Sequence, residues 1–142
     1  MRNIGWIFLF VLLLGPVAAK ADLIIIIHGA TNVTSIDKKM IKDIFTGQKT
    51  VWDDNTKITF ATLKEGEVNK EFLKEYVQKT PSQFQNFWRQ KIFLGQATKL
   101  PLACESMEEM IEYVSKTPGS IGYLSSDKKD SGGNIKEILI VK

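Results

Sequence analysis

Cysteine, histidine and proline are all scarce, since the 142 residues contain one cysteine, one histidine and four prolines. With Cys104 alone, no disulfide can form within the chain, so we expect stability to come from packing. A free thiol in an exported protein can be reactive or can pair between chains. Free cysteines are more often buried, and we expect Cys104 to be a small apolar side chain at the end of a strand.

Residues that carry enzyme chemistry are also few. His28 is the only histidine, and no G-x-S-x-G, P-loop or H-E-x-x-H motif occurs. Asp127, Asp130 and Asn134 share a glycine-containing loop, but their spacing misses that of a calcium-binding loop. The sequence therefore predicts a protein that is not an enzyme and that has no cofactor and no metal site.

Charge of one sign is not in large excess, because 19 Lys and Arg residues stand against 16 Asp and Glu residues. A nucleic-acid interface needs basic residues clustered on one face, and the sequence contains no such cluster. We expect no nucleic-acid partner.

The first residues have the pattern of a secretory signal peptide. A basic start at Arg2 precedes an apolar segment over 4–14, and an A-x-A site ends at Ala21. A transmembrane anchor is the alternative, but this apolar segment is short for a bilayer span. We predict cleavage after Ala21, which leaves 22–142 as a single exported domain.

Apolar patterns in the remaining chain predict an α/β fold. The LIIII run at 23–27 is typical of a strand that is buried on both faces. Further strands are predicted at 57–62, 100–104, 121–124 and 138–141, the last of them buried. Helices are predicted at 36–45, 68–77, 81–92 and 107–114. This alternation predicts one three-layer domain, with a mostly parallel or mixed five-stranded sheet and helices on both faces.

Capping signals set the ends of these helices. For the first helix we expect Thr34 or Ser35 as the N-cap, Asp37 in the first turn, and Gly47 as the stop. Residues 80–83 and 106–109 both have the form of a capping box. The aromatic residues of the third helix recur at helical spacing, and core packing is the favoured interpretation over a ligand platform. They are Phe84, Phe87 and Trp88, followed by Ile92.

The stretch ITFATLKEGEVNKEFLKEY at 58–76 predicts the candidate binding site. It reads as a strand, a polar loop with Gly66, and an amphipathic helix, an arrangement that can hold an anion at the helix N-terminus. Glu67 is unfavourable there, because a carboxylate repels an anion. The candidate ligand-binding residues in this stretch are Thr62, Lys64, Gly66 and Asn69. We add His28 and Thr31, because we expect the carboxyl end of the first strand to lie at the same sheet edge, although a structural role for His28 is the commoner one.

Three phrases together carry a family resemblance: IDKKMIKDIFTGQKTVW at 36–52, TLKEGEVNKEF at 62–72 and TPGSIGYLS at 117–125. They resemble the periplasmic phosphate-binding protein of the ABC phosphate importer and the wider type 2 periplasmic-binding-protein family. The resemblance covers 22 to about 126 and extends to the second of the family's two lobes only. It implies an exported solute-binding protein, a periplasmic location, phosphate or another small oxyanion as ligand, and an ABC permease as partner.

The loop over 63–69 departs from the family's anion-binding loop, which typically reads Arg, two acidic residues, Gly, Ser, Gly, Thr. Of that set only Glu65 and Gly66 keep the family's character. The resemblance implies that Lys64 replaces the lost Arg as a point charge, and that Asn69 replaces the Thr as a donor. The lost contacts and the added Glu67 are expected to weaken phosphate binding.

Two functions follow from these observations. The first is a lobe that binds phosphate or another small oxyanion, with a homodimer completing the site. The second is a periplasmic interaction module that has lost the ligand pocket and contacts a membrane sensor or a transporter component.

Overall fold

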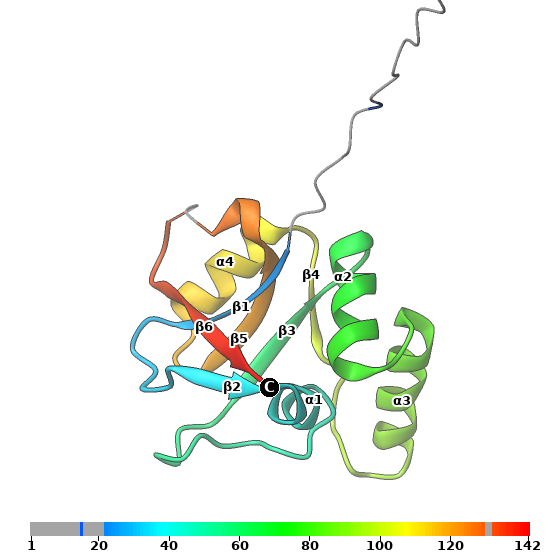
Figure 1. Cartoon of the computed structure of the whole chain (residues 1–142). Helices are drawn as coiled ribbons and strands as arrows, with labels where there is room; N and C mark the ends of the chain where they lie inside the picture. Colours follow the sequence, from blue (N-terminus) through cyan, green and yellow to red (C-terminus); the bar gives the residue numbers. More distant parts are fainter. Residues whose placement is uncertain (1–14, 16–21, 130–131) are drawn as a thin grey trace, which may run out of the picture.

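A six-stranded mixed sheet forms the centre of the computed structural model, which describes Gly15, residues 22–129 and residues 132–142 (Figure 1). The predicted signal peptide at 1–21 lies, apart from Gly15, outside the described residues. The strand order is β2-β6-β1-β5-β3-β4. The strands are β1 (Leu23–His28), β2 (Ser35–Asp37), β3 (Thr59–Leu63), β4 (Leu102–Cys104), β5 (Ser120–Ser125) and β6 (Ile135–Val141).

The α/β class and the mixed sheet are confirmed, but the predicted number of five strands is wrong. The additional strand is β2, which is three residues long and pairs in parallel with β6, Ile36 opposite Ile140. A strand this short shows too few alternations for a sequence pattern to reveal it.

Strand direction divides the sheet. β5, β3 and β4 run parallel to one another, whereas β1 runs antiparallel to both of its neighbours, β5 and β6. The carboxyl end of β1 therefore lies at the opposite sheet edge from the carboxyl ends of β3, β4 and β5.

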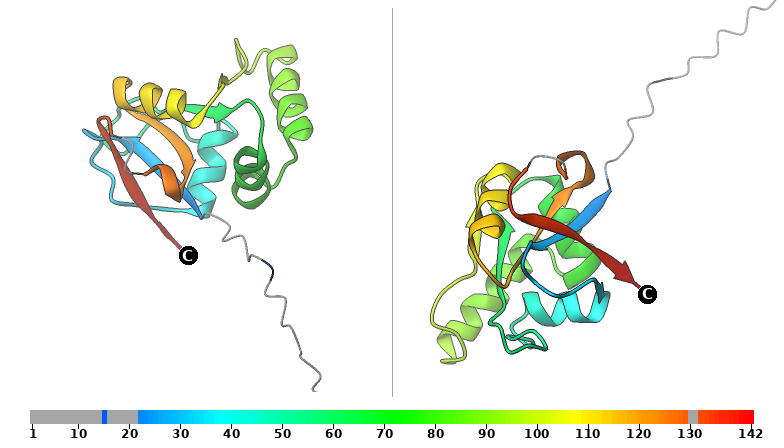
Figure 2. Two further views of the ribbon diagram at one scale, coloured as in Figure 1. Left: turned by 90° about the horizontal axis from the view of Figure 1, so that it is seen from above. Right: turned by 90° about the vertical axis from the view of Figure 1, so that its left-hand side faces the viewer.

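Helices cover both faces of the sheet, as predicted (Figure 2). In β5, Gly122 faces Met110 of α4 (Met107–Lys116), whereas the next residue, Tyr123, stacks on Phe72 of α2 (Glu67–Phe72). Successive strand residues point to opposite faces, so α4 and α2 belong to different layers. The helix α3 (Pro81–Phe93) lies beside the β3–β4 side of the sheet, far from β6 in both views of Figure 2.

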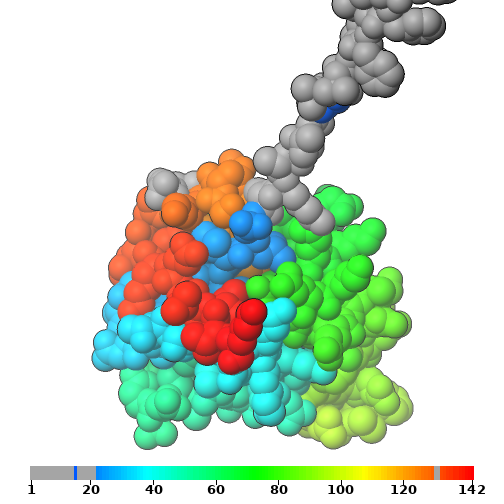
Figure 3. Space-filling model, in the orientation of Figure 1, coloured from blue at the N-terminus to red at the C-terminus, as the bar shows by residue number. Residues whose placement is uncertain are grey.

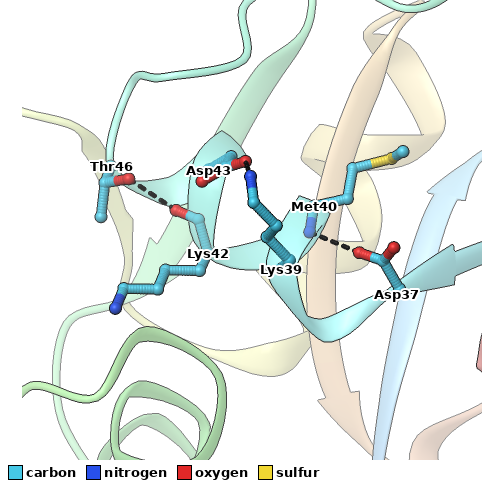
Figure 4. A network of polar contacts seen from close by, with 6 residues as sticks. All are labelled: Asp37, Lys39, Met40, Lys42, Asp43 and Thr46. Atoms are coloured by element: carbon cyan, nitrogen blue, oxygen red, sulfur yellow. Dashed lines mark hydrogen bonds and ion pairs between the residues drawn. The ribbon is translucent and has the colours of Figure 1, made fainter. Parts of the chain in front are cut away.

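The first helix, α1 (Lys38–Phe45), starts later than the sequence predicts. Its N-cap is Asp37, whose carboxylate accepts a 2.7 Å hydrogen bond from the Met40 N–H (Figure 4). The predicted caps, Thr34 and Ser35, lie before and within β2, and Asp37 is not in the first turn. Strand pairing of 35–37 with β6 thus overrides the helical pattern that begins at Ile36. The predicted stop is confirmed, since Gly47 has a φ of 77° directly beyond the helix.

The predicted helix over 68–77 consists of two segments. The α2 segment gives way to a π-helical segment, η1 (Leu73–Val77), which ends at Gln78 in the left-handed conformation. The π segment turns Leu73, Tyr76 and Val77 into the core. The apolar stripe was therefore predicted correctly, whereas the change of helical period was not.

The capping box before α3 is confirmed, because Thr80 and Gln83 exchange hydrogen bonds of 2.9 and 3.1 Å. The box before α4 is confirmed only in part. Ser106 accepts from the Glu109 N–H, but the Glu109 carboxylate accepts from the N–H of Glu105 rather than from that of Ser106. Each bond caps a helix and fixes where its first turn begins.

Aromatic side chains fill the core between the sheet and the α1–α2 layer. Phe72 stacks on Tyr123 with ring centroids 3.7 Å apart, and Phe45 packs against both rings. The prediction that the aromatic stripe of α3 belongs to the core is confirmed for Phe84 and Trp88, which are buried. Burial of such rings contributes a large share of the hydrophobic stabilisation.

The last strand is longer and more exposed than predicted. Ile138 is buried, but Leu139 and Val141 are exposed on the outer surface of β6. Figure 3 shows β6, in red, on the surface of the molecule beside β1 and β2. A final buried strand was therefore the wrong prediction, since its apolar residues do not all face the core.

Candidate functional site

The carboxyl ends of β3 and β4 meet the N-terminus of α2 at one edge of the sheet. Lys64 and Gly66 lie in the loop between β3 and α2, and Gly66 is the N-cap of α2 with a φ of 99°. Glycine adopts this left-handed region without steric strain and contributes no capping side chain. The first N–H groups of a helix have no intrahelical acceptor, so those of α2 face this loop.

Asn69, in the first turn of α2, is held by a buried hydrogen-bonded chain. The Tyr123 hydroxyl accepts from the Leu63 N–H at 2.8 Å and donates to Asn69 Oδ1 at 2.6 Å. Burial raises the pKa of the Tyr123 hydroxyl, so it stays protonated and keeps donating. The position of Oδ1 fixes that of Nδ2, and the donors of the Asn69 amide are therefore oriented before any ligand arrives.

A pocket of about 120 Å³ lies beside Asn69, between β3, the start of α3 and the segment before β4. Asn69 lines this pocket, and within the described ranges its Nδ2 group has no hydrogen-bond acceptor, although the residue is only 3% exposed. The other lining residues are Thr62, Leu63, Lys64, Leu73, Pro81, Phe84, Gln85, Trp88, Leu100, Pro101 and Ala103. An oriented amide donor thus faces a small cavity that is mostly apolar.

Thr62, Lys64 and Gln85 are the other polar residues among the described residues that line the pocket. The Thr62 hydroxyl donates to the Leu102 carbonyl at 3.3 Å, which leaves its oxygen as an acceptor. Lys64 Nζ lies 3.1 Å from the Glu105 carboxylate, and this hydrogen bond raises the pKa of the Lys64 ammonium. Lys64 therefore carries a full positive charge at neutral pH, part of which Glu105 compensates.

Carboxylates surround the rest of this edge. A surface depression between the N-termini of α2 and α4 is lined by Glu65, Glu67, Glu105 and Glu108. Among the described residues, Lys128 is the one cation in its lining. The Glu108 backbone N–H and the Lys128 ammonium lower the pKa of Glu108, which is therefore ionised at neutral pH. The combined negative field of these four carboxylates opposes ligands with several negative charges more strongly than ligands with one.

His28 and Thr31 do not join this site. The expectation that His28 shares a sheet edge with Thr62 to Asn69 is wrong, because β1 runs antiparallel to β5. At the opposite edge, His28 Nδ1 accepts from the Ala30 N–H, and Nε2 lies 3.3 Å from the Asn134 amide. These contacts fit the alternative interpretation of His28 as a structural residue that secures the turn after β1.

Cys104 ends β4 and is fully buried, which confirms its predicted place. Burial raises the pKa of its thiol to about 11, with a further contribution from the Glu109 carboxylate. The thiolate is the reactive form.

We therefore expect Cys104 to react with iodoacetamide at pH 8 roughly 100-fold more slowly than an unhindered cysteine. Because the Cys104 thiol stays protonated until the pH nears 11, the rate of alkylation should keep rising between pH 8 and about 11. Intact mass spectrometry follows the reaction, and guanidinium chloride, which exposes the thiol, serves as the control. Alkylation of the folded protein at the rate of a free thiol would contradict the burial.

Two negative findings concern the described part of the chain. Within residues 22–129 and 132–142, no three His, Cys, Asp or Glu side chains lie together as a metal-ion site would require. Over the same residues, no helix has both the length and the apolar character to cross a membrane.

Sequence reasoning did not find Tyr123 or the α3 wall of the pocket. Tyr123 lies in an apolar strand, where a tyrosine predicts core packing, and it is 54 residues from its partner Asn69. Trp88 and Phe84 were predicted as core residues, and they also form the pocket wall. The buried polar end of a tyrosine was the available signal, since such a hydroxyl needs a partner.

Comparison with known proteins extends these observations. The sequence profile of the PBP superfamily domain matches residues 17–137. Among proteins with curated descriptions, none matches the chain.

Solved structures that match include a phosphate-binding protein and an ABC-type phosphate transport receptor. PstS from Borrelia burgdorferi matches with a TM-score of 0.63 and 21% identity, over 84% of this chain and 47% of its own. An ABC-type phosphate transport receptor from Vibrio cholerae matches with a TM-score of 0.64 and 19% identity, over 84% and 46%. A phosphate-binding protein from Stenotrophomonas maltophilia matches with a TM-score of 0.59 and 16% identity, over 84% and 39%. The chain thus spans less than half the length of these proteins, as expected for one of two lobes.

Proposed function

The chain belongs to the PBP superfamily, and from this premise we propose that it is an exported solute-binding protein that holds a small oxyanion beside Lys64 and Asn69. Solved structures with the same fold include an ABC-type phosphate transport receptor and a phosphate-binding protein. An ABC permease is accordingly the transport partner that we propose. The predicted signal peptide, with cleavage after Ala21, supports a periplasmic location.

The observation that carries the proposal is the fixed amide of Asn69. The Tyr123 hydroxyl donates to Asn69 Oδ1 and so orients the Nδ2 donors of this residue, which lines the same pocket as Lys64. A hydrogen bond from an oriented donor costs less entropy on binding than one from a mobile side chain. The charge of Lys64 favours an acceptor that is negative.

Removal of the Lys64 charge tests this site. We expect Lys64→Ala to weaken binding of the preferred oxyanion about three- to tenfold, because one exposed ammonium contact is lost. Calorimetric titration with phosphate, sulfate, nitrate, molybdate and small organic acids measures the affinity.

The matched control is Lys39→Ala, which removes another exposed lysine and its ion pair with Asp43 on α1, away from the pocket. Affinity for the oxyanion should be unchanged in this control. Equal affinities of the wild type and Lys64→Ala would remove Lys64 from the site. No heat with any of these anions would reject oxyanion binding by this lobe.

A second function is favoured by the apolar residues exposed near the ends of α3 and β4. Phe93 is 88% exposed, and Leu94, Leu100 and Leu102 are exposed as well. An exposed apolar group of this kind is typical of contact surfaces. In this alternative the chain is an interaction module that contacts a membrane sensor or a transporter component, or forms a homodimer.

Replacement of Phe93 and Leu94 by serine separates the two functions. An interaction module would lose its cross-linked partner in membrane extracts, or its dimer in sedimentation, while keeping its fold. A solute-binding protein would keep its anion affinity in the same variant.

A further inference from the structure

We propose that the pocket beside Asn69 selects a small monocarboxylate with an apolar body, rather than inorganic phosphate. The inference rests on the proposed oxyanion site and names the class of solute that it takes. The carboxylate would lie against Asn69 Nδ2 and Lys64, and the apolar body would extend toward α3. Three features of the described residues support this assignment.

The first feature is the apolar wall. The apolar residues Leu73, Phe84, Trp88 and Leu100 are part of the pocket lining. Phe84 and Trp88 are themselves buried and held by ring contacts, with centroids 6.4 Å apart, and Trp88 Nε1 donates to the Phe45 carbonyl at 3.2 Å. Inorganic phosphate has no group that gains from such a wall, whereas each methylene group buried there is favourable by the hydrophobic effect.

The second feature is charge. Among the described residues that line the pocket, Lys64 is the only cation, and the Glu105 carboxylate already lies 3.1 Å from its Nζ. Glu65 and Glu67 adjoin the same loop. A divalent phosphate meets twice the repulsion that a monocarboxylate meets from these carboxylates, with one partly compensated cation to offset it.

The third feature is the set of hydrogen-bonding groups. Asn69 Nδ2 presents two donor hydrogens, and within the described residues neither has an acceptor. The Asn69 amide and the Lys64 ammonium suit the two oxygens of a carboxylate. The volume of the pocket, about 120 Å³, also suits a small ligand, because it is well below the range of pockets for drug-sized ligands.

The test is a calorimetric titration of the purified protein with butanoate, hexanoate, benzoate and phosphate. Hexanoate or benzoate should bind at least about tenfold more tightly than phosphate, and hexanoate more tightly than butanoate because of its additional methylene groups. Asn69→Asp keeps the oxygen that accepts from Tyr123, but replaces the donor by a carboxylate. This variant should lower hexanoate affinity by at least about tenfold.

Two controls keep the result interpretable. Asn86→Asp makes the same chemical change at an exposed position of α3 that does not line this pocket, and it should bind hexanoate as the wild type does. Ala103→Phe fills the pocket from the exposed strand β4 without removing a core contact, and it should abolish hexanoate binding even if Asn69→Asp fails to fold.

The other outcomes overturn the inference in distinguishable ways. Phosphate binding with equal or weaker carboxylate binding would reject the monocarboxylate assignment and leave the proposed oxyanion site intact. Hexanoate binding that survives both Asn69→Asp and Ala103→Phe would place the ligand elsewhere. No binding of any of these four probes would reject the inference, whereas the proposed function would be rejected only if sulfate, nitrate and molybdate also failed to bind.

Discussion

Replacement of Tyr123 by phenylalanine is expected to lower the free energy of unfolding by about 2–4 kcal/mol, although only one oxygen atom is lost. That oxygen accepts from the Leu63 N–H and donates to Asn69 Oδ1. Both partners are buried, and neither can turn to water when the hydroxyl is gone. A buried donor or acceptor without a partner costs its desolvation free energy, and this change creates one of each.

Urea unfolding of the variant measures the loss, and Tyr113→Phe is its matched control. Tyr113 lies on α4, is only partly buried, and its hydroxyl makes no hydrogen bond within the described residues. Its replacement should change stability by less than about 0.5 kcal/mol. Similar stabilities for both variants would show that the Tyr123 hydroxyl does not bridge β3 and α2.

Replacement of Gly119 by alanine is expected to cost about 3–5 kcal/mol, by two additive mechanisms. Gly119 has a φ of 80°, which an alanine adopts only with strain, and a Cβ atom there would overlap the Lys57 carbonyl oxygen. Relief of the overlap requires backbone movement. That movement would disturb the Gly119 carbonyl, which accepts from Trp52 Nε1 at 3.0 Å and from the Thr59 N–H at 3.4 Å.

Comparison with Gly95→Ala separates the cost of the steric overlap from the cost of the backbone conformation. Gly95 has a φ of 74°, but a Cβ atom there would meet nothing within 4 Å. We expect its replacement to cost only about 1–2 kcal/mol, the price of the left-handed backbone conformation. Both variants are compared by urea unfolding, and equal losses would show that the approach of Lys57 does not constrain Gly119.

The parts of the fold that sequence reasoning predicted correctly depend on local patterns. The isoleucine run at 24–27 predicted a strand buried on both faces, and Thr80 with Gln83 predicted the start of α3. Both signals act over a few residues, and tertiary contacts agree with them. Where local and tertiary preferences differ, as at 35–37, pairing with β6 moved the helix start to Lys38, with Asp37 as the N-cap.

The candidate site was predicted in part for the same reason. Thr62 lies near the end of β3, and Lys64, Gly66 and Asn69 follow this strand in the sequence. The structure brings all four to one edge, where Gly66 lines the neighbouring depression and the other three line the pocket. Inclusion of His28 required the direction of β1, which no local pattern encodes. A chain of apolar residues fits a parallel or an antiparallel place in a mixed sheet equally well.

The network around Asn69 could not be derived from local patterns, because it joins residues far apart in the chain. Tyr123 contacts Leu63 and Asn69 across separations of 60 and 54 residues. Its role depends on the register of β5 with β3, which pair only at Thr59–Ser120 and Phe60–Ile121. Beyond these pairs the hydroxyl of Tyr123 takes up the Leu63 N–H that main-chain pairing would otherwise satisfy.

The position of the bound solute is tested most directly by the amide resonances of the ¹⁵N-labelled protein during titration with hexanoate and with phosphate. We predict saturable shifts of the backbone amides over 64–69 and of the Asn69 side-chain NH₂, while the His28 and Thr31 amides at the opposite edge stay in place. Saturable shifts at His28 and Thr31 alone, or none over 64–69 with either ligand, would contradict a solute site at the start of α2.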